Sequence, residues 1–587
     1  ALDALTTVSN TVAVGTSALS ANTSGVSNTG VGHEALAANT TGGENTALGY
    51  GALDANTTAS NNTGLGYLAL SANTTGASNT AVGANALDAN TTGTYNVGVG
   101  FEALSASTTT SQNTGVGYRA LKDNTGSYNS AFGMSALQSN TTGSNNTAVG
   151  RDALVSNTTG ASSTAVGYQA LYTNTTYSEN TAIGHKALYT NGGGYSNTAV
   201  GHETLMANTT GAEQTAVGHD ALTDNTTGTE NTAFGFAALT NNTTGNSNTA
   251  LGRKTLFTNT TGTGNVAVGQ GALLANTTAS DNVAMGYDAL VANTTGAEGV
   301  AIGRNSLDAN TTGNNNVGIG YSSLGANTTG GSNVAVGSYA LDANTTSSDN
   351  VAVGHHSLGT NITGTQNTAI GKGSLFSNTT SNNTAAGFEA LNANTTGTQN
   401  VAVGAGALDA NTTAANNTAV GYRAAYTQEG ASAQNTAVGM SALYTNNGGE
   451  YNTALGYYSM QGATTGDYNT AIGASTMVAA NTGSYNNAVG YLALTANTSG
   501  AQNNAVGAGS LDANTTGSYN TAMGHDSLSA NTTASNNTAF GHSALALNTT
   551  GDTNVSIGLN SLDANTTGSA NTAVGVHALG GNTTADN

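Results

Sequence analysis

The sequence predicts an all-β fold, a parallel β-solenoid with seventeen residues in each coil. Three features predict it: a fixed period along the chain, short β-prone segments bounded by turn residues, and the absence of proline. The chain has 587 residues, with 81 glycines and no proline, cysteine or tryptophan. Ordinary usage would give about 30 prolines in a chain of this length. We therefore expect a fold that excludes proline throughout.

The repeat is marked by the glycine of a recurring Asn-Thr-Ala-Val-Gly segment. This glycine first occurs at Gly15, returns at positions such as Gly83 and Gly269, and last occurs at Gly575. Nearly all steps from one such glycine to the next have the full period, while two are one residue shorter and one is one residue longer. A short fixed period indicates stacked units. We expect one continuous solenoid of about 34 coils over residues 1–587.

Counting repeat positions from the asparagine, the consensus is Asn-Thr-Ala-Val-Gly-x-x-Ala-Leu-x-Ala-Asn-Thr-Thr-Gly-x-x. Such a repeat is too short for a helical pair, and Asn, Thr and Gly are poor helix formers. We expect one strand near positions 1–4 and a second near positions 8–13. Each coil would bond to the next through its backbone, and proline would remove a donor from this ladder.

Two apolar columns are the predicted core. Strand side chains alternate, so positions 2 and 4 face one side and position 3 faces the other. Position 4 is apolar in nearly every coil, and position 9 is Leu in all but three. The predicted core residues include Val14, Leu19, Val82, Leu87, Val268 and Leu273.

The small residues at position 3 and the glycines at position 5 form a second pair of columns. We expect Ala81 and Ala267, with the turn glycines Gly15, Gly83 and Gly269, to allow close packing. Burial of two apolar side chains per coil stabilises the fold by less than the loss of backbone entropy in the whole coil opposes it. A lone coil would be marginally stable, so we expect a parallel homo-oligomer in which position 3 packs against a sister molecule.

Charge placement identifies the exposed corners and excludes several functions. The chain has 30 acidic and 9 basic residues, a net charge of −21. Eight of the basic residues stand at positions 6 or 7, and unpaired charges favour water. So few cations cannot neutralise a nucleic-acid backbone, and we expect no nucleic-acid partner. No apolar stretch is long enough for a membrane span.

The sequence shows no solenoid cap. Because uncapped ends would expose edge strands, we expect flanking segments or end-to-end contacts.

Histidines form a column at position 6, where seven of the nine occur. His185, His202 and His219 belong to three consecutive coils. Stacked imidazoles about 4.8 Å apart could bind a metal or sense pH. The competing interpretation is a half-exposed corner that accepts His, Tyr, Phe or Arg, and it leads us to expect no metal and no cofactor. A stripe of such rings could also stack on sugars or on neighbouring fibres.

The Asn-Thr-Thr of positions 12–14 creates glycosylation sequons, as at Asn39, Asn56, Asn73 and Asn208. The alternative is a ladder of asparagine amides that bond from coil to coil and are too buried to be glycosylated. The Thr columns raise a further alternative, an ice-binding or glycan-binding solenoid with a flat face rich in Thr and Asn.

Residues 421–481 depart from the consensus. Ala425, Met460 and Met477 replace the position-9 Leu, and Ala463 replaces the position-12 Asn. We interpret these coils as irregular members of the same solenoid. No polar feature is unique to one place in the chain, so we expect no enzymatic activity.

The segments Thr80–Gly83 and Val300–Gly303 resemble the head repeats of YadA-like trimeric autotransporter adhesins, and similar repeats occur in phage-type tail-fibre proteins. The resemblance covers the whole chain, although this repeat is longer than the adhesin repeat. It implies a left-handed β-roll, a homotrimer and a role in surface adhesion. We therefore expect an extracellular structural fibre at a cell or virion surface, with copies of itself as partners and a host-surface glycan as a further one.

Overall fold

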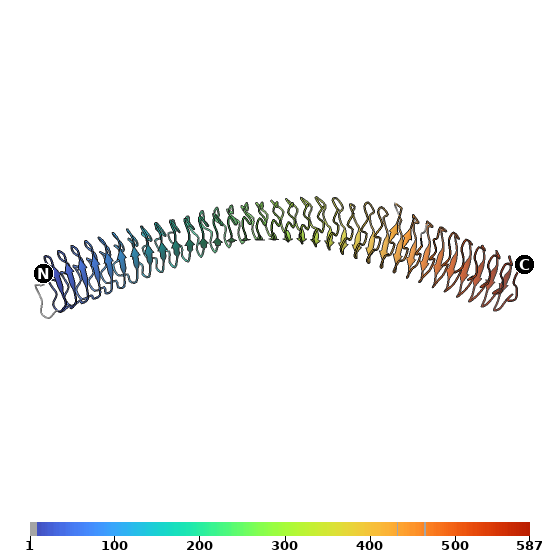
Figure 1. The fold of residues 1–587 in the computed structure, drawn as a ribbon, viewed down its shortest axis with the longest axis horizontal. Helices are drawn as coiled ribbons and strands as arrows, with labels where there is room; N and C mark the ends of the chain where they lie inside the picture. Colours follow the sequence, from blue (N-terminus) through green and yellow to red (C-terminus); the bar gives the residue numbers. More distant parts are fainter. Residues whose placement is uncertain (1–8, 431–432, 463–464, 587) are drawn as a thin grey trace. The chain divides into compact units, whose positions relative to one another are not determined.

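The computed structural model describes residues 9–430, 433–462 and 465–586. They form an all-β parallel β-solenoid of about 33 turns with 17 residues per turn. The chain divides into two units, Ala1–Ala297 and Glu298–Asn587, and in each unit the coils follow one another along the stack (Figure 1). Within the described ranges no helix is long and apolar enough to cross a membrane.

Each regular coil contributes one short strand at positions 2–4. In the first unit the strands are β1 (Val12–Val14), β2 (Thr29–Val31), β3 (Thr46–Leu48), β4 (Thr63–Leu65), β5 (Thr80–Val82), β6 (Val97–Val99), β7 (Thr114–Val116), β8 (Ser130–Phe132), β9 (Thr147–Val149), β10 (Thr164–Val166), β11 (Thr181–Ile183), β12 (Thr198–Val200), β13 (Thr215–Val217), β14 (Thr232–Phe234), β15 (Thr249–Leu251), β16 (Val266–Val268) and β17 (Val283–Met285).

The second unit continues the same pattern. Its strands are β18 (Val300–Ile302), β19 (Val317–Ile319), β20 (Val334–Val336), β21 (Val351–Val353), β22 (Thr368–Ile370), β23 (Thr384–Ala386), β24 (Val401–Val403), β25 (Thr418–Val420), β26 (Thr427–Gln428), β27 (Thr436–Val438), β28 (Thr445–Asn446), β29 (Thr453–Leu455), β30 (Thr470–Ile472), β31 (Asn487–Val489), β32 (Asn504–Val506), β33 (Thr521–Met523), β34 (Thr538–Phe540), β35 (Val555–Ile557) and β36 (Thr572–Val574).

Consecutive coils pair in parallel and in register. Between β5 and β6, for example, Thr80 pairs with Val97, Ala81 with Gly98 and Val82 with Val99. The ladder continues outside the strands, because the N–H of Leu87 donates to the carbonyl of Ala103 in the next coil at 2.9 Å. Backbone donors are thus used around much of the coil, which explains why proline is excluded.

The predicted second strand is wrong for the regular coils. Positions 8–13 form turns, and the Leu of position 9 has a positive φ, +52° at Leu87. A left-handed residue cannot continue an extended strand. Within the described residues, a second pair of strands occurs only where β26 and β28 pair at positions 11 and 12 of two irregular coils.

Position 9 fills the interior as predicted, but position 4 does not. Leu19, Leu87 and Leu273 are fully buried. Val14 is 56% exposed, and Val82 and Val268 are half-buried on the outer face of the sheet. The prediction that the Val column belongs to the core of the chain is therefore wrong.

Position 3 faces the interior of its own coil, so the prediction that it packs against a sister molecule is also wrong. Ala81 and Ala267 are fully buried within the single chain. The reason is the thinness of the coil. At Gly98 a Cβ atom would already lie 3.2 Å from Cγ of Leu87 in the preceding coil. Position 3 therefore holds a small residue, such as Gly98, Ala81 or Ser556, against the leucine of the preceding coil.

The position-5 glycines occupy the close-packed turns predicted for them. Gly15, Gly83 and Gly269 have φ values of +129°, +130° and +121°. A Cβ on Gly83 would lie 2.6 Å from the carbonyl oxygen of Gly100 in the next coil. Every other residue would therefore be excluded by both conformation and space.

Asparagine amides run through the interior. Asn39 Nδ2 donates to Oδ1 of Asn22 in the preceding coil at 2.9 Å and to the carbonyl of Gly42 at 2.9 Å. A second ladder joins the position-1 asparagines, whose Oδ1 accepts the next asparagine N–H, as between Asn62 and Asn79 at 2.8 Å. The sequon residues Asn39, Asn56, Asn73 and Asn208 are fully buried. The asparagine-ladder interpretation is thus confirmed.

The irregular coils keep the position-9 column apolar. Ala425, Met460 and Met477 stand in the leucine column and are buried. Ala463 lies outside the described residues.

Candidate functional site

Three surfaces carry the chemistry of the molecule: the position-6 corner, the outer face of the sheet, and a small pocket in the second unit. At the corner, the chain leaves each strand through the position-5 glycine and turns, which places position 6 in water. Arg151, for example, has a side chain that is 60% exposed. The prediction that charges mark this corner is confirmed there.

The predicted histidines meet at this corner of the first unit and form the centre of a stack of five rings. The ring centroids of His185 and His202 lie 4.8 Å apart with planes 7° from parallel, and those of His202 and His219 lie 4.7 Å apart. Tyr168 stacks on His185 at 5.4 Å, and Phe236 stacks on His219 at 5.5 Å. Neighbouring rings thus restrain the planes of all three imidazoles.

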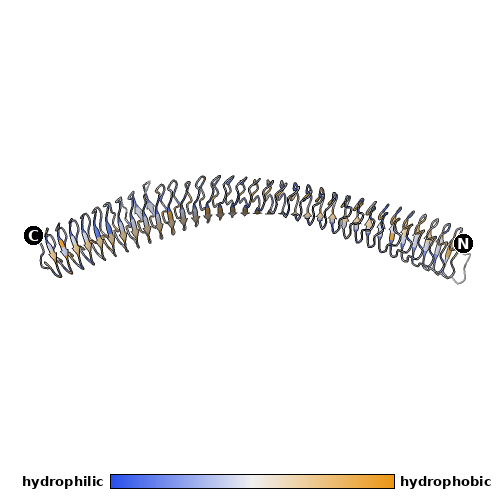
Figure 2. Ribbon diagram, turned by 180° about the vertical axis from the view of Figure 1, so that it is seen from behind, coloured by the Kyte–Doolittle hydropathy of each residue, from blue (hydrophilic) through white to orange (hydrophobic). Residues whose placement is uncertain are grey.

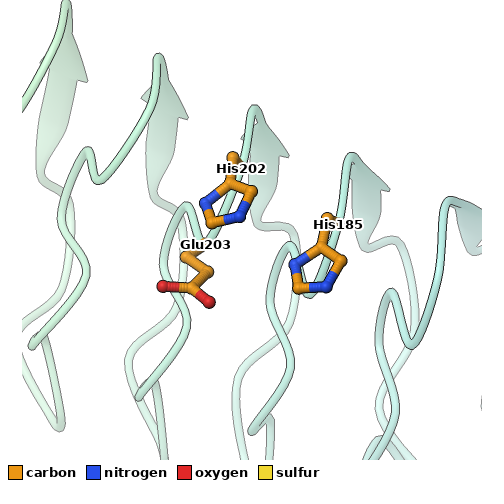
Figure 3. A group of neighbouring side chains, drawn as sticks. All are labelled: His185, His202 and Glu203. Carbon is orange, nitrogen blue, oxygen red and sulfur yellow. The ribbon is translucent and has the colours of Figure 1, made fainter.

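Two carboxylates at position 7 complete the group. The oxygen of Glu203 lies near the nitrogens of His185 and His202, and the three ligand atoms are within 4.8 Å of one another (Figure 3). His202, His219 and Asp220 form an equivalent group one coil later, in which His219 Nδ1 lies 3.0 Å from Asp220 Oδ2. Sequence reasoning found the histidines and missed these acids.

The left-handed conformation of position 7 explains why the acids belong to the group. Glu203 and Asp220 have φ values of +51° and +57°. Their N–H groups donate to the carbonyls of His185 and His202 in the preceding coil, at 2.9 and 3.1 Å. A position-7 residue is therefore fixed beside the position-6 residue of the coil before it, a neighbour that sequence adjacency does not reveal.

A second stacked histidine pair has no carboxylate at position 7 of its second coil. His525 and His542 have centroids 5.2 Å apart and planes 6° from parallel. Position 7 of the second coil is Ser543, whose N–H donates to the carbonyl of His525 at 2.8 Å and whose hydroxyl lies 2.9 Å from His542 Nδ1. The acid of this pair, Asp526, is in the first coil and contacts His525 at 3.0 Å.

The outer face of the sheet carries the position-2 and position-4 side chains. None of the described strands contains a charged residue, and Figure 2 colours most strands toward the hydrophobic end of its scale. The exposed large apolar residues of position 4 in the first unit are Val14, Leu48, Leu65, Phe132, Val149, Ile183, Phe234, Leu251 and Met285. In the second unit they are Ile302, Ile370, Val403, Val420, Leu455, Met523, Phe540, Ile557 and Val574.

A small pocket in the second unit combines rings with polar groups. Phe388, Tyr422 and Tyr426 line it together with Asp409 and Arg423. The Arg423 guanidinium lies 5.3 Å from the Tyr422 ring centroid and 5.4 Å from that of Tyr426. Burial raises the pKa of the Asp409 carboxyl, partly offset by a hydrogen bond from Tyr426.

Several aspartates of the position-10 column have raised pKa values. Burial raises the pKa of Asp54, Asp88, Asp342 and Asp512 above the ordinary value of 3.8. Within the described residues, one carboxylate oxygen of Asp54, Asp88 and Asp512 is buried without a hydrogen-bond partner. These acids therefore oppose folding when ionised.

No protein-family model matches the chain, and no curated protein matches it significantly.

Proposed function

We propose that the protein is a non-catalytic structural fibre that assembles from parallel copies of itself through the outer face of the sheet. The observation that supports this is the uncharged apolar column of position 4. Monomeric proteins seldom expose continuous apolar patches of more than a few hundred Å². A face that repeats one exposed apolar side chain in coil after coil of each unit favours a partner with the same period.

A second copy of this chain is the partner with that period. Parallel copies bring equivalent coils to the same level, so each Val, Ile, Leu or Phe meets another apolar side chain. The net charge of −21 opposes association, but the strands themselves carry no charge. The resemblance to adhesin head repeats favours three copies and a left-handed coil. We therefore propose a left-handed homotrimer.

The proposed setting is the outside of a cell or virion, where a long repetitive fibre spans distance and presents its corners to another surface. The rings and polar groups at Phe388, Tyr422 and Asp409 would suit a sugar, since aromatic rings offer an apolar platform and carboxylates accept hydrogen bonds from hydroxyls. A host-surface glycan is thus the proposed external ligand.

Charge substitutions on the sheet face test the assembly. The double variant Val149→Lys, Ile183→Lys places two cations on the proposed interface, where their desolvation would be unfavourable. We expect a reduced molar mass in analytical ultracentrifugation. The control Thr159→Lys, Thr176→Lys adds the same charge at exposed position-14 sites of the same unit and should leave the mass unchanged. Equal masses for both variants would contradict the proposed interface.

The same face supports a second candidate, an ice-binding surface. Position-2 Thr and position-4 apolar side chains point outward from neighbouring strands in register, as in the pairing of Thr164 with Thr181 and Val166 with Ile183. Regular ranks of methyl and hydroxyl groups are a feature suited to ordering water. A monomer that depresses the freezing point with thermal hysteresis would support this candidate, whereas an oligomer that buries the face would exclude it.

A further inference from the structure

We propose that the corner centred on His202 binds one divalent transition-metal ion. His202 is the shared ligand. The other two ligands are either His185 and Glu203 or His219 and Asp220. This site is independent of the proposed assembly, because it lies at the position-6 corner and not on the outer face of the sheet.

The donor set selects the class of metal. Two imidazoles and one carboxylate suit Zn²⁺, Cu²⁺ or Ni²⁺, while Ca²⁺ and Mg²⁺ require oxygen ligands. Three protein ligands on an exposed corner leave the remaining coordination positions to water. A carboxylate and the neutral form of an imidazole each offer a lone pair to a metal ion.

The geometry needs only small movements. Ligand atoms of Glu203 and both histidines lie within 4.8 Å of one another. Bonds of about 2.0–2.1 Å to a tetrahedral ion correspond to ligand separations of about 3.3–3.5 Å. Movements of the ligand atoms by roughly an ångström would close that difference. The exposed histidines and the half-buried Glu203 can make them while the rings stay stacked (Figure 3).

The main chain and the ring stack hold the site in place. The N–H groups of Glu203 and Asp220 bond to the carbonyls of His185 and His202, which fixes the offset between acid and imidazole. Tyr168 and Phe236 cover the two ends of the imidazole stack. The nearby Lys186 ammonium lies 5.8 Å from the Tyr189 ring centroid, where a cation–π contact accommodates its charge.

Sharing of His202 predicts the stoichiometry. Both groups include His202, and two divalent ions bound to one imidazole would repel each other, so we expect one ion per chain. Either histidine at the ends of the trio can be lost without losing the site. His202 cannot, because it belongs to both groups.

Isothermal titration calorimetry of Zn²⁺ into the unchanged chain and its histidine variants tests the predicted role of His202. We expect His202→Ala to weaken the site by at least about tenfold, since loss of even an outer-sphere partner of a ligand costs about 10- to 100-fold. His185→Ala and His219→Ala should each retain one ion. Binding by His202→Ala equal to that of the unchanged chain, or no binding by the unchanged chain, would overturn the proposal.

The His525 and His542 pair provides a matched control and a gain-of-site experiment. It has the stacked rings but Ser543 in place of the acid, so His542→Ala should leave Zn²⁺ binding unchanged. Ser543→Glu should add a second ion per chain, while the neutral Ser543→Gln should not. If Zn²⁺ binding were lost in His542→Ala but kept in His202→Ala, the ion would be bound at the His525 and His542 pair, which would contradict the proposed site.

Cu²⁺ gives an independent spectroscopic readout. Electron paramagnetic resonance of one equivalent of bound Cu²⁺ should show hyperfine coupling to two imidazole nitrogens, and the His202→Ala variant should lose that signature. A spectrum with oxygen ligands alone in the unchanged chain would show nonspecific binding to surface acids and would overturn the site.

Discussion

Leucine at position 9 shows how tertiary packing overrides local preference in this chain. Leu87 has a φ of +52°, a region in which bulky residues are uncommon. Its side chain is nevertheless fully buried, and the same conformation recurs at Leu19 and Leu273. The conformational cost is offset by placing one leucine beneath the strand of each following coil. Sequence patterns cannot reveal this, since leucine carries no signal for positive φ.

The assignment of inside and outside follows from the same residue. The sequence correctly predicts that positions 3 and 4 face opposite sides, because strand alternation is general. Hydrophobicity then suggests that Val is inside and Ala is outside. The structure reverses this, as a leucine below Gly98 leaves no room for a branched side chain. Volume in a thin coil decides the orientation, and volume is not visible in one-dimensional periodicity.

Truncation of these two columns should therefore have unequal effects. Leu87→Ala creates a cavity and should destabilise its region by about 2–5 kcal/mol. Val82→Ala removes methyl groups from a half-exposed side chain and should cost less than about 1 kcal/mol in a dissociated chain. Hydrogen exchange of the amides around residues 80–105 measures both. A larger loss of protection in Val82→Ala would contradict the orientation of the strand.

Buried carboxylates predict how stability depends on pH. Burial raises the pKa of Asp54 and Asp88, so the folded chain binds more protons than the unfolded chain between their unfolded and folded values. The free energy of unfolding should thus rise as pH falls from neutral through the raised pKa, and this contribution should level off below 3.8.

The variant Asp54→Asn, Asp88→Asn removes both carboxylates and should flatten this part of the pH profile in denaturant unfolding. Glu44→Gln changes an exposed acid and serves as the control. The expectation fails if the double variant keeps the full pH dependence.

At the scale of the element, one short strand and a set of turns replace the two strands predicted for each coil. The first strand was predictable because Thr-Ala-Val has β-prone residues in an alternating pattern. Positions 8–13 have similar residues, but left-handed φ values at positions 7 and 9 bend the chain away from an extended path. The same left-handed position 7 brings Glu203 to His185. The histidine trio was thus predictable from its period, whereas its acids required the backbone.

The asparagine ladder is the element that joins the turns. Asn90 Nδ2 donates to Oδ1 of Asn73 at 2.8 Å and to the carbonyl of Gly93 at 3.1 Å, with the side chain fully buried. Asn90→Asp removes both donors and buries a charge, so it should destabilise the surrounding coils by several kcal/mol, about 3 or more.

Limited proteolysis of Asn90→Asp should cut near residues 73–107. Asn85→Asp changes an asparagine on the half-buried position-7 corner and should leave the protease resistance intact. Resistance of the Asn90→Asp chain would show that the ladder does not hold the turns.

For the whole molecule, the period predicts the solenoid and the missing proline predicts its continuous ladder of hydrogen bonds. The surface available for oligomerisation was not predicted correctly. The sequence favours self-association through the small-residue column, yet that column is internal. The proposed assembly uses position 4 instead, where the side chains of Ile183 and Phe234 are 40% and 48% exposed and leave apolar surface uncovered in one chain.

The molar mass of the unchanged protein in solution tests self-association through the position-4 face most directly. Native mass spectrometry or sedimentation equilibrium should give three times the chain mass of 57.3 kDa. A species with the single-chain mass of 57.3 kDa at micromolar concentration, with the apolar column still in water, would contradict the proposed fibre.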